Sequence, residues 1–251
     1  MSILELKNIT KTFDGLKAVD SLFVGFEKEK ITALIGPNGA GKTTVFNLIN
    51  GFILPDSGEI YYKNQNIVGL KPWEIANLGI GRLFQDVRVF GKMSVIDNVL
   101  CAFKNQKGEI FYYPIFQTWK VKREEKIYKE KALELLDFVG LIDKKDDLAE
   151  NLSYGQQKLL AIARLLANDS DLLLLDEPTA GVNPKMIDKL LELIQKLPTQ
   201  GKTIIIIEHN MNVVIDIADW VYFMNNGQIT SFGLPQDVLG DPEVKKTYIG
   251  I

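Results

Sequence analysis

The sequence has one cysteine, one histidine and no long apolar run. A single cysteine, Cys101, excludes an intramolecular disulfide and a cysteine-rich metal site, and its apolar neighbours predict a buried, inert thiol. The longest β-like apolar runs, 172–175 and 204–207, fall far short of the roughly 18 residues that indicate a membrane span. The start, MSILELKNIT, lacks the basic and apolar stretches of a signal peptide. We therefore expect a cytoplasmic protein that reaches a membrane only through a partner.

Positive and negative charges nearly balance, with 29 Lys and Arg against 32 Asp and Glu. The net charge is −3, which argues against a nucleic-acid binder driven by phosphate contacts. Hydrophobic residues make up 46% of the 251 residues, enough for the substantial core of one large domain. The chain also has no long-period repeat and no low-complexity tract.

The segment GPNGAGKT is the most informative motif and fits the phosphate-binding pattern G-x-x-x-x-G-K-[ST]. An apolar run at 31–35 leads into it and a helix-like run at 45–49 leads out, although a glycine turn before an ordinary helix is the competing interpretation. The glycines allow successive N–H groups to point at one anion. Lys42 is predicted to reach the β- and γ-phosphates, and the Thr43 hydroxyl to bind Mg²⁺. The ATP-binding candidates in this loop are Gly36, Pro37, Asn38, Gly39, Ala40, Gly41, Lys42, Thr43 and Thr44.

A second motif, LLLLDEP at 172–178, ends an apolar strand in two carboxylates. Buried carboxylates need hydrogen-bond partners or ions. Asp176 is predicted to hold Mg²⁺, and Glu177 to orient and deprotonate an attacking water. Alone, the motif describes equally well a strand that ends in an acidic turn; beside a phosphate loop it favours nucleotide hydrolysis.

Strands and helices alternate after residue 170, which is typical of a parallel sheet covered on both faces. Short β segments are predicted over 1–30, and the region 86–165 reads as mostly helical. We expect an α/β fold in which a P-loop NTPase core carries an N-terminal antiparallel β subdomain and an inserted helical subdomain. The core with its β subdomain is expected at 1–85 and 166–251, all within a single domain.

Five motifs follow one another in order: the phosphate loop, Gln85 after an apolar strand, LSYGQ at 152–156, LLLLDEP, and His209 after IIIIE. This order resembles the ATP-binding subunits of ATP-binding cassette (ABC) transporters over essentially the whole chain. The resemblance implies that Gln85 senses Mg²⁺ and the attacking water. It implies that His209 contacts the γ-phosphate and positions the water with Glu177, and that Phe13 stacks on adenine. A structural histidine and an ordinary half-buried phenylalanine are the alternatives.

The resemblance also implies a head-to-tail pair of cassettes with two ATP molecules between them. The partner is a second ABC ATPase, either another copy or a paralogue, so hydrolysis is expected to need dimerisation. The residues expected to bind the partner's ATP are Ser153, Gly155 and Gln156. The catalytic set implied is Glu177, His209, Gln85 and Lys42. The Mg²⁺ set is Thr43, Gln85 and Asp176.

Two departures from the usual pattern point to a subfamily. Tyr154 replaces a glycine of LSGGQ, and Asn183 stands where many cassettes have aspartate. LSYGQQ, EPTAGVNP, IIEHNM and the terminal DPEVKKTYIG resemble the ATPases of branched-chain amino-acid importers. That resemblance implies an ATPase on the cytoplasmic face of the membrane, attached to transmembrane permease subunits, with a solute-binding protein in the whole system and no nucleic acid.

Three alternatives stay open. They are a lipid-exporter ATPase, a soluble ABC ATPase acting on nucleic acid or ribosomes, and a nucleotide-gated module without turnover. A separate question concerns an aromatic segment, which either packs the helical lobe or docks a helix of the membrane subunit. Its aromatic members are Phe111, Tyr112, Tyr113, Phe116 and Trp119.

Overall fold

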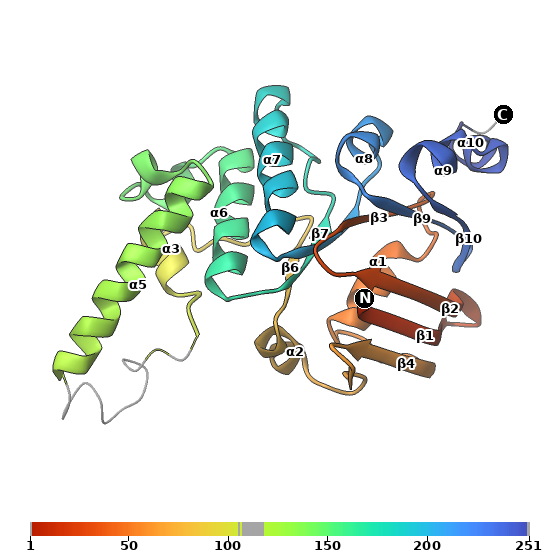
Figure 1. Cartoon of the computed structure of the whole chain (residues 1–251), viewed down its shortest axis with the longest axis horizontal. Helices are drawn as coiled ribbons and strands as arrows, with labels where there is room; N and C mark the ends of the chain where they lie inside the picture. The colour runs from red at the N-terminus through yellow and green to blue at the C-terminus, as the bar shows by residue number, and fades with distance from the viewer. Residues whose placement is uncertain (1, 105, 107–117, 250–251) are drawn as a thin grey trace. The chain divides into compact units, whose positions relative to one another are not determined.

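The computed structural model describes residues 2–104, 106 and 118–249, and only the backbone at 118–121 and 248–249. These residues form two compact units (Figure 1). The sheet unit comprises Met1–Gln85, Asp171–Ala180 and Leu191–Ile251, and the helical unit comprises Asp86–Ser170 and Gly181–Leu190. Compared with the division expected from the sequence, residues 166–170 and 181–190 group with the helical unit.

The sheet unit contains two sheets, which confirms the predicted fold class. The antiparallel sheet has the order β2-β1-β4-β5 and consists of β1 (Ser2–Phe13), β2 (Leu16–Glu27), β4 (Ser57–Tyr62) and β5 (Gln65–Asn66). The larger sheet has the order β10-β9-β3-β8-β7-β6 and is parallel except for the β9–β10 hairpin. Its strands are β3 (Ile31–Ile35), β6 (Ile80–Leu83), β7 (Leu172–Asp176), β8 (Thr203–Ile207), β9 (Trp220–Asn225) and β10 (Gln228–Gly233).

Helices connect and cover these strands. The sheet unit holds α1 (Lys42–Ile49), α2 (Pro72–Leu78), α8 (Met211–Ile217), α9 (Pro235–Gly240) and α10 (Pro242–Ile249). The helical unit holds α3 (Val95–Leu100), α5 (Thr118–Phe138) and α6 (Tyr154–Ala167). The chain of α7 (Pro184–Lys196) belongs partly to each unit. Short 3-10 turns occupy Ile142–Lys144, Ala149–Asn151 and Pro198–Gln200. Across the part of the chain that is described, every helix is too short or too polar to cross a membrane.

The core of the sheet unit lies around α1. Figure 1 shows α1 between the two sheets and α8 on the other side of the larger sheet. Phe46 of α1 belongs to one buried cluster with Leu174 and Ile205 of the larger sheet and with Leu6 and Ile60 of the smaller one. Side chains alternate along a strand, so β7 and β8, buried at every position, are apolar on both faces. Each such side chain contributes roughly 1.5–3 kcal/mol by its burial, and together they hold the carboxyl ends of β3, β7 and β8 side by side.

The helical unit is built on α3, α5 and α6, which pack against one another. Ser94 caps α3, because its side chain accepts a hydrogen bond from the Asp97 N–H. The prediction of a buried thiol at Cys101 is wrong: α3 ends at Leu100, so Cys101 occupies the C-cap and is exposed. Residues 111–116 of the aromatic segment lie outside the described residues, and only the backbone of Trp119 is described, so its docking role stays a prediction.

Candidate active site

The phosphate loop runs from the end of β3 to the start of α1, and its glycines are needed for two physical reasons. Gly41, the N-cap of α1, has φ 107°, a left-handed conformation that side chains disfavour. A methyl group at Gly36 would lie 2.0 Å from the Met224 carbonyl oxygen of the neighbouring strand β9. The loop therefore adopts its shape only with glycine at these positions, and α1 begins without a side-chain cap.

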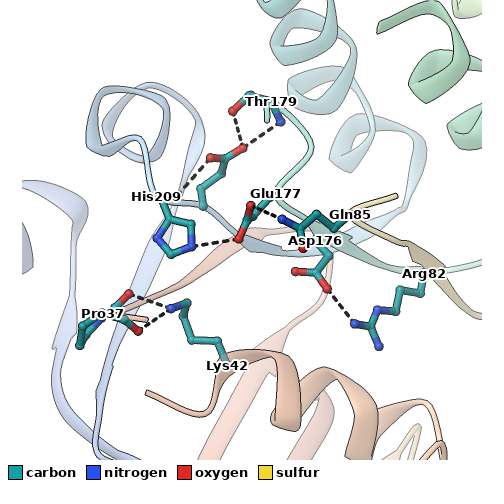
Figure 2. Close-up of polar contacts among 10 residues, drawn as sticks. Pro37, Lys42, Arg82, Gln85, Asp176, Glu177, Thr179 and His209 are labelled. Atoms are coloured by element: carbon teal, nitrogen blue, oxygen red, sulfur yellow. Dashed lines mark hydrogen bonds and ion pairs between the residues drawn. The ribbon is translucent and has the colours of Figure 1, made fainter. Parts of the chain in front are cut away.

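Lys42 turns back into this loop and is only 6% exposed. Its Nζ donates hydrogen bonds to the carbonyl oxygens of Gly36 (2.7 Å) and Pro37 (2.9 Å), as Figure 2 shows. Burial lowers the pKa of Lys42 below its ordinary 10.5, and the negative charges of Glu177 and Asp176 oppose that shift. The ammonium group is thus held at the loop by weak backbone acceptors that phosphate oxygens can replace.

A cavity of about 190 Å³ opens beside the loop. Pockets that enclose a whole small molecule measure about 300–1,000 Å³, so this unit surrounds only part of a nucleotide. The lining residues come from β2, the phosphate loop and the ends of β7 and β8: Ala18, Asn38, Gly39, Ala40, Gly41, Lys42, Thr43, Thr44, Glu177, Ile207 and His209. The predicted carboxylate and histidine are therefore brought to the phosphate loop by the parallel sheet.

Glu177 is held from both sides. Gln85 Nε2 donates to its Oε2 (3.0 Å), and His209 Nε2 lies 3.0 Å from its Oε1, where the tautomer protonated at Nε2 donates (Figure 2). The backbone of Glu177 has φ 47°, a left-handed conformation that costs a residue with a side chain roughly 1–2 kcal/mol. Its N–H donates to the Ile207 carbonyl oxygen (2.9 Å), which fixes the turn after β7. Three residues expected to act together on one water thus converge.

Asp176 has a partner that sequence reasoning missed. Arg82 of β6 donates from Nη2 to Asp176 Oδ2 (2.7 Å), and both side chains are almost fully buried. Arg82 also donates from Nη1 to Asn47 Oδ1 (2.7 Å), and its Cζ lies 5.5 Å from the centre of the Phe46 ring and 4.8 Å from that of Phe84. An arginine inside the apolar strand IGRLF was the available signal, because a buried charge requires a partner.

Glu208 is the second residue that was missed. It directly follows β8 and is only 3% exposed. Its Oε1 accepts hydrogen bonds from the Thr179 N–H (3.0 Å) and hydroxyl (2.7 Å). The signal was a carboxylate after four isoleucines, a position where a charge is buried unless the strand has already ended.

The site suits a small, hard cation such as Mg²⁺. Among the described residues no three His, Cys, Asp or Glu side chains gather as a metal-binding group. Mg²⁺, however, is usually held by one or two protein oxygens together with substrate phosphates. Arg82 occupies Oδ2 of Asp176, and within the described ranges Oδ1 has no hydrogen-bond partner. The ligands that fit Mg²⁺ at this site are Asp176 Oδ1, the Thr43 hydroxyl oxygen and the Gln85 amide oxygen.

The LSYGQ segment belongs to the helical unit. Ser153 caps α6 in a reciprocal pair: its side chain accepts from the Gln156 N–H (3.4 Å), and Gln156 Oε1 accepts from the Ser153 N–H (2.9 Å). A methyl group at Gly155 would lie 2.5 Å from Met186 Cγ. Asn183 Oδ1 accepts from the Met186 N–H (3.0 Å) at the start of α7. The predicted contact of this segment with a partner's ATP stays a prediction.

Phe13, at the end of β1, is 45% exposed. Lys11 Nζ lies 5.4 Å from the centre of its ring. An exposed ring is what base stacking requires, and its role toward adenine remains a prediction.

Comparison with known proteins gives a consistent result. The protein family described as ABC transporter matches residues 19–180. A probable branched-chain amino acid transport ATP-binding protein LivG of Archaeoglobus fulgidus is 41% identical over 100% of this chain and 96% of its own. The high-affinity branched-chain amino acid transport ATP-binding protein LivG of Escherichia coli K12 is 38% identical over 99% of this chain and 98% of its own.

Solved structures agree in fold. The ADP conformation of an ATP-binding cassette of an ABC transporter has a TM-score of 0.86 at 35% identity, and each chain is covered completely. A dimeric post-hydrolysis state of an ATP-binding cassette bound to ADP and Pi has a TM-score of 0.74 at 26% identity, covering 92% of this chain and 98% of its own.

Proposed function

The chain belongs to the ABC transporter family, and we propose that it is the ATP-hydrolysing subunit of an importer for branched-chain amino acids. The observation that carries the proposal is Glu177, held between Gln85 and His209 at the rim of the phosphate-loop cavity. A module that only bound nucleotide would have no need of a carboxylate held in this way. The names of the full-length relatives favour amino-acid import over lipid export and over action on nucleic acid.

ATP is the substrate, and the phosphate loop binds its phosphates. The N–H groups at the start of α1 and the Lys42 ammonium stabilise the negative charge that spreads over the transferred phosphoryl group. Phe13 stacks on the adenine. Thr43, Asp176 and Gln85 are the side chains that would hold Mg²⁺, which when bound would supply positive charge against the negative charge of the phosphates.

Glu177 acts as the general base. The water oxygen bonds to the γ-phosphorus, the bond from that phosphorus to the bridging oxygen breaks, and the water proton passes to the Glu177 carboxylate. His209 and Gln85 each contact one carboxylate oxygen, so the carboxylate is held in a fixed direction. General-base catalysis of this kind supplies roughly 100- to 10,000-fold in rate.

A second cassette completes the site. The cavity of about 190 Å³ is too small to enclose a nucleotide alone. Ser153, Gly155 and Gln156 of a second cassette bind the exposed side of the ATP, and the same three residues of this chain serve the partner's ATP. A related cassette has been solved as a dimer with ADP and Pi. Closing and opening of the pair moves permease subunits, which hold the ATPase at the cytoplasmic face of the membrane, while a solute-binding protein delivers the amino acid.

The decisive test is Glu177→Gln, which keeps the size of the side chain and its ability to form hydrogen bonds but removes the carboxylate base. We expect steady-state phosphate release to fall at least about 100-fold, while ATP affinity stays within twofold and ATP drives formation of a stable dimer. Glu192→Gln, on an exposed face of α7, is the matched control. Wild-type turnover in Glu177→Gln would refute the hydrolytic role. Purification from native membranes tests the transport role: co-purifying membrane subunits support it, and bound nucleic acid contradicts it.

A further inference from the structure

Glu208 has no part in the mechanism above, yet it is one of the few buried charged residues of the sheet unit. It accepts three hydrogen bonds: two from Thr179, through the N–H and the hydroxyl, and one from the His209 N–H to Oε2 (3.2 Å). Every partner is a donor. A carboxylate accepts all three without offering a competing proton, whereas an amide would turn an N–H toward one of these donors.

These bonds are part of a closed ring of contacts that includes the general base, Glu177. Thr179 lies two residues after Glu177, and His209 lies one residue after Glu208. The ring continues from His209 Nε2 to Glu177 Oε1 (3.0 Å), with a brace from the Glu177 N–H to the Ile207 carbonyl (2.9 Å). Figure 2 shows Thr179, Glu177 and His209, with the side-chain hydrogen bonds of this ring drawn as dashed lines. The two turns that follow β7 and β8 are thus tied together at both their backbones and their side chains.

The ring also accounts for the backbone of Glu177. A left-handed conformation at a residue with a side chain persists only where its surroundings hold it. The Ile207 carbonyl holds the chain at Glu177 itself, and Glu208 holds it two residues later at Thr179. Without Glu208, the segment after Glu177 would lose the two hydrogen bonds that hold it at Thr179.

We propose that Glu208 is a positioning residue for ATP hydrolysis: it locks the turn after Glu177 to the turn that carries His209, and so sets the direction of the general base. This inference rests on the proposed function. Misplacing a catalytic group by about 1 Å can cost roughly 100-fold in rate. The phosphate loop is not part of the ring, so nucleotide affinity is not expected to depend on it.

The test is Glu208→Gln, assayed for kcat, for KM and for binding of a fluorescent ATP analogue. We expect kcat to fall about 10- to 100-fold with analogue affinity within twofold of wild type. Thr179→Val removes the hydroxyl donor alone and should lower kcat less, and Thr179→Ser should restore it. In single-turnover assays on Glu177→Gln, adding Glu208→Gln should change nothing, because the group being positioned is already gone.

Several results would overturn the inference. Wild-type kcat in Glu208→Gln would do so, as would a loss of analogue affinity equal to the loss of kcat, or a further drop in the Glu177→Gln background. If Glu208→Gln does not fold, the Thr179→Val and Thr179→Ser pair decides: equal turnover in the two refutes the proposal. Failure of the proposed function is recognised separately, because Glu177→Gln itself would then retain turnover.

Discussion

Two helices of this protein begin at segments suited to bind phosphate, and they begin differently. At α1 the N-cap is Gly41, in a left-handed conformation and without a side-chain cap. At α6 the N-cap is Ser153, and Ser153 and Gln156 satisfy each other's backbone N–H groups. The first four N–H groups of a helix lack partners within it. At α1 they are left for a ligand, while at α6 the chain already uses its own side chains.

Under the proposed function, this difference predicts that the α1 half of the site is formed in one chain, whereas the α6 half forms only when a second cassette brings its ATP. A phosphate arriving at α1 replaces only the two carbonyl oxygens that Lys42 contacts. A phosphate arriving at α6 must compete with the Ser153–Gln156 pair. The glycines differ too. Gly41 is required both by its positive φ angle and by the Ala18 carbonyl oxygen beside it, whereas Gly155 is required by the space that Met186 occupies.

The largest effect on ATP affinity should come from a side chain added at Gly41, the N-cap of α1. In Gly41→Ala the new methyl group would lie 2.1 Å from the Ala18 carbonyl oxygen, in a backbone conformation that alanine disfavours. We expect at least about 100-fold loss of ATP affinity, from strain of about 1–3 kcal/mol plus the clash. Gly39→Ala is the matched control, since it has positive φ but nothing within 4 Å. Titration with a fluorescent ATP analogue measures both, and equal losses would contradict the role given to the clash.

Removing the Lys42 ammonium group, at the start of the same helix, should weaken ATP binding somewhat less. In Lys42→Ala the charge-assisted bonds to phosphate, about 1.5–3 kcal/mol, are lost, so ATP should bind roughly 10- to 100-fold more weakly. Lys7→Ala, at an exposed ion pair with Glu5, serves as the control. Calorimetric titration with ATP measures the change. Affinity equal to wild type would remove Lys42 from the phosphate site.

At α6, two substitutions separate the cap from the ligand. Ser153→Ala should lower the free energy of unfolding by about 1 kcal/mol through loss of the cap and weaken the ATP-driven dimer. Ser153→Asp keeps a capping side chain but repels phosphate, so stability should remain near wild type while the dimer is lost. Urea unfolding and light scattering with ATP in the Glu177→Gln background measure the two quantities.

Ser94→Ala provides the control for this pair, because Ser94 caps α3 in the same unit and is expected to have no contact with nucleotide. It should lose similar stability and dimerise normally. A Ser153→Asp protein that dimerises like wild type would show that α6 does not meet phosphate.

The smallest effect is a pH dependence at α1. Burial lowers the pKa of Lys42 below 10.5, so in the window below 10.5 the unfolded chain binds this proton more tightly than the folded protein. The free energy of unfolding of the nucleotide-free protein should therefore rise with pH there, relative to Lys42→Met. Urea unfolding of both proteins between pH 8 and 10 measures the difference, since their other lysines are shared. A difference that falls with pH would contradict the assignment.

Much of the site was accessible from the sequence because its groups lie next to strand ends and glycines. The phosphate loop and Glu177 each follow an apolar strand, Asp176 ends one, and parallel strands bring their carboxyl ends to one edge. Gln85 and His209 needed the order of motifs as well. Cys101 was misjudged because apolar neighbours do not reveal where a helix ends.

By itself, the sequence determined the fold class and the phosphate loop, and it pointed to Glu177 as the general base that we propose, because these depend on local patterns that a strand, a glycine or a carboxylate imposes. Only the tertiary structure decided what holds those groups. Arg82 reaches Asp176 across 94 residues of sequence and Glu208 reaches Thr179 across 29. A charged residue in an apolar strand predicts that it has a partner. Which partner it contacts depends on which strands the sheet places side by side.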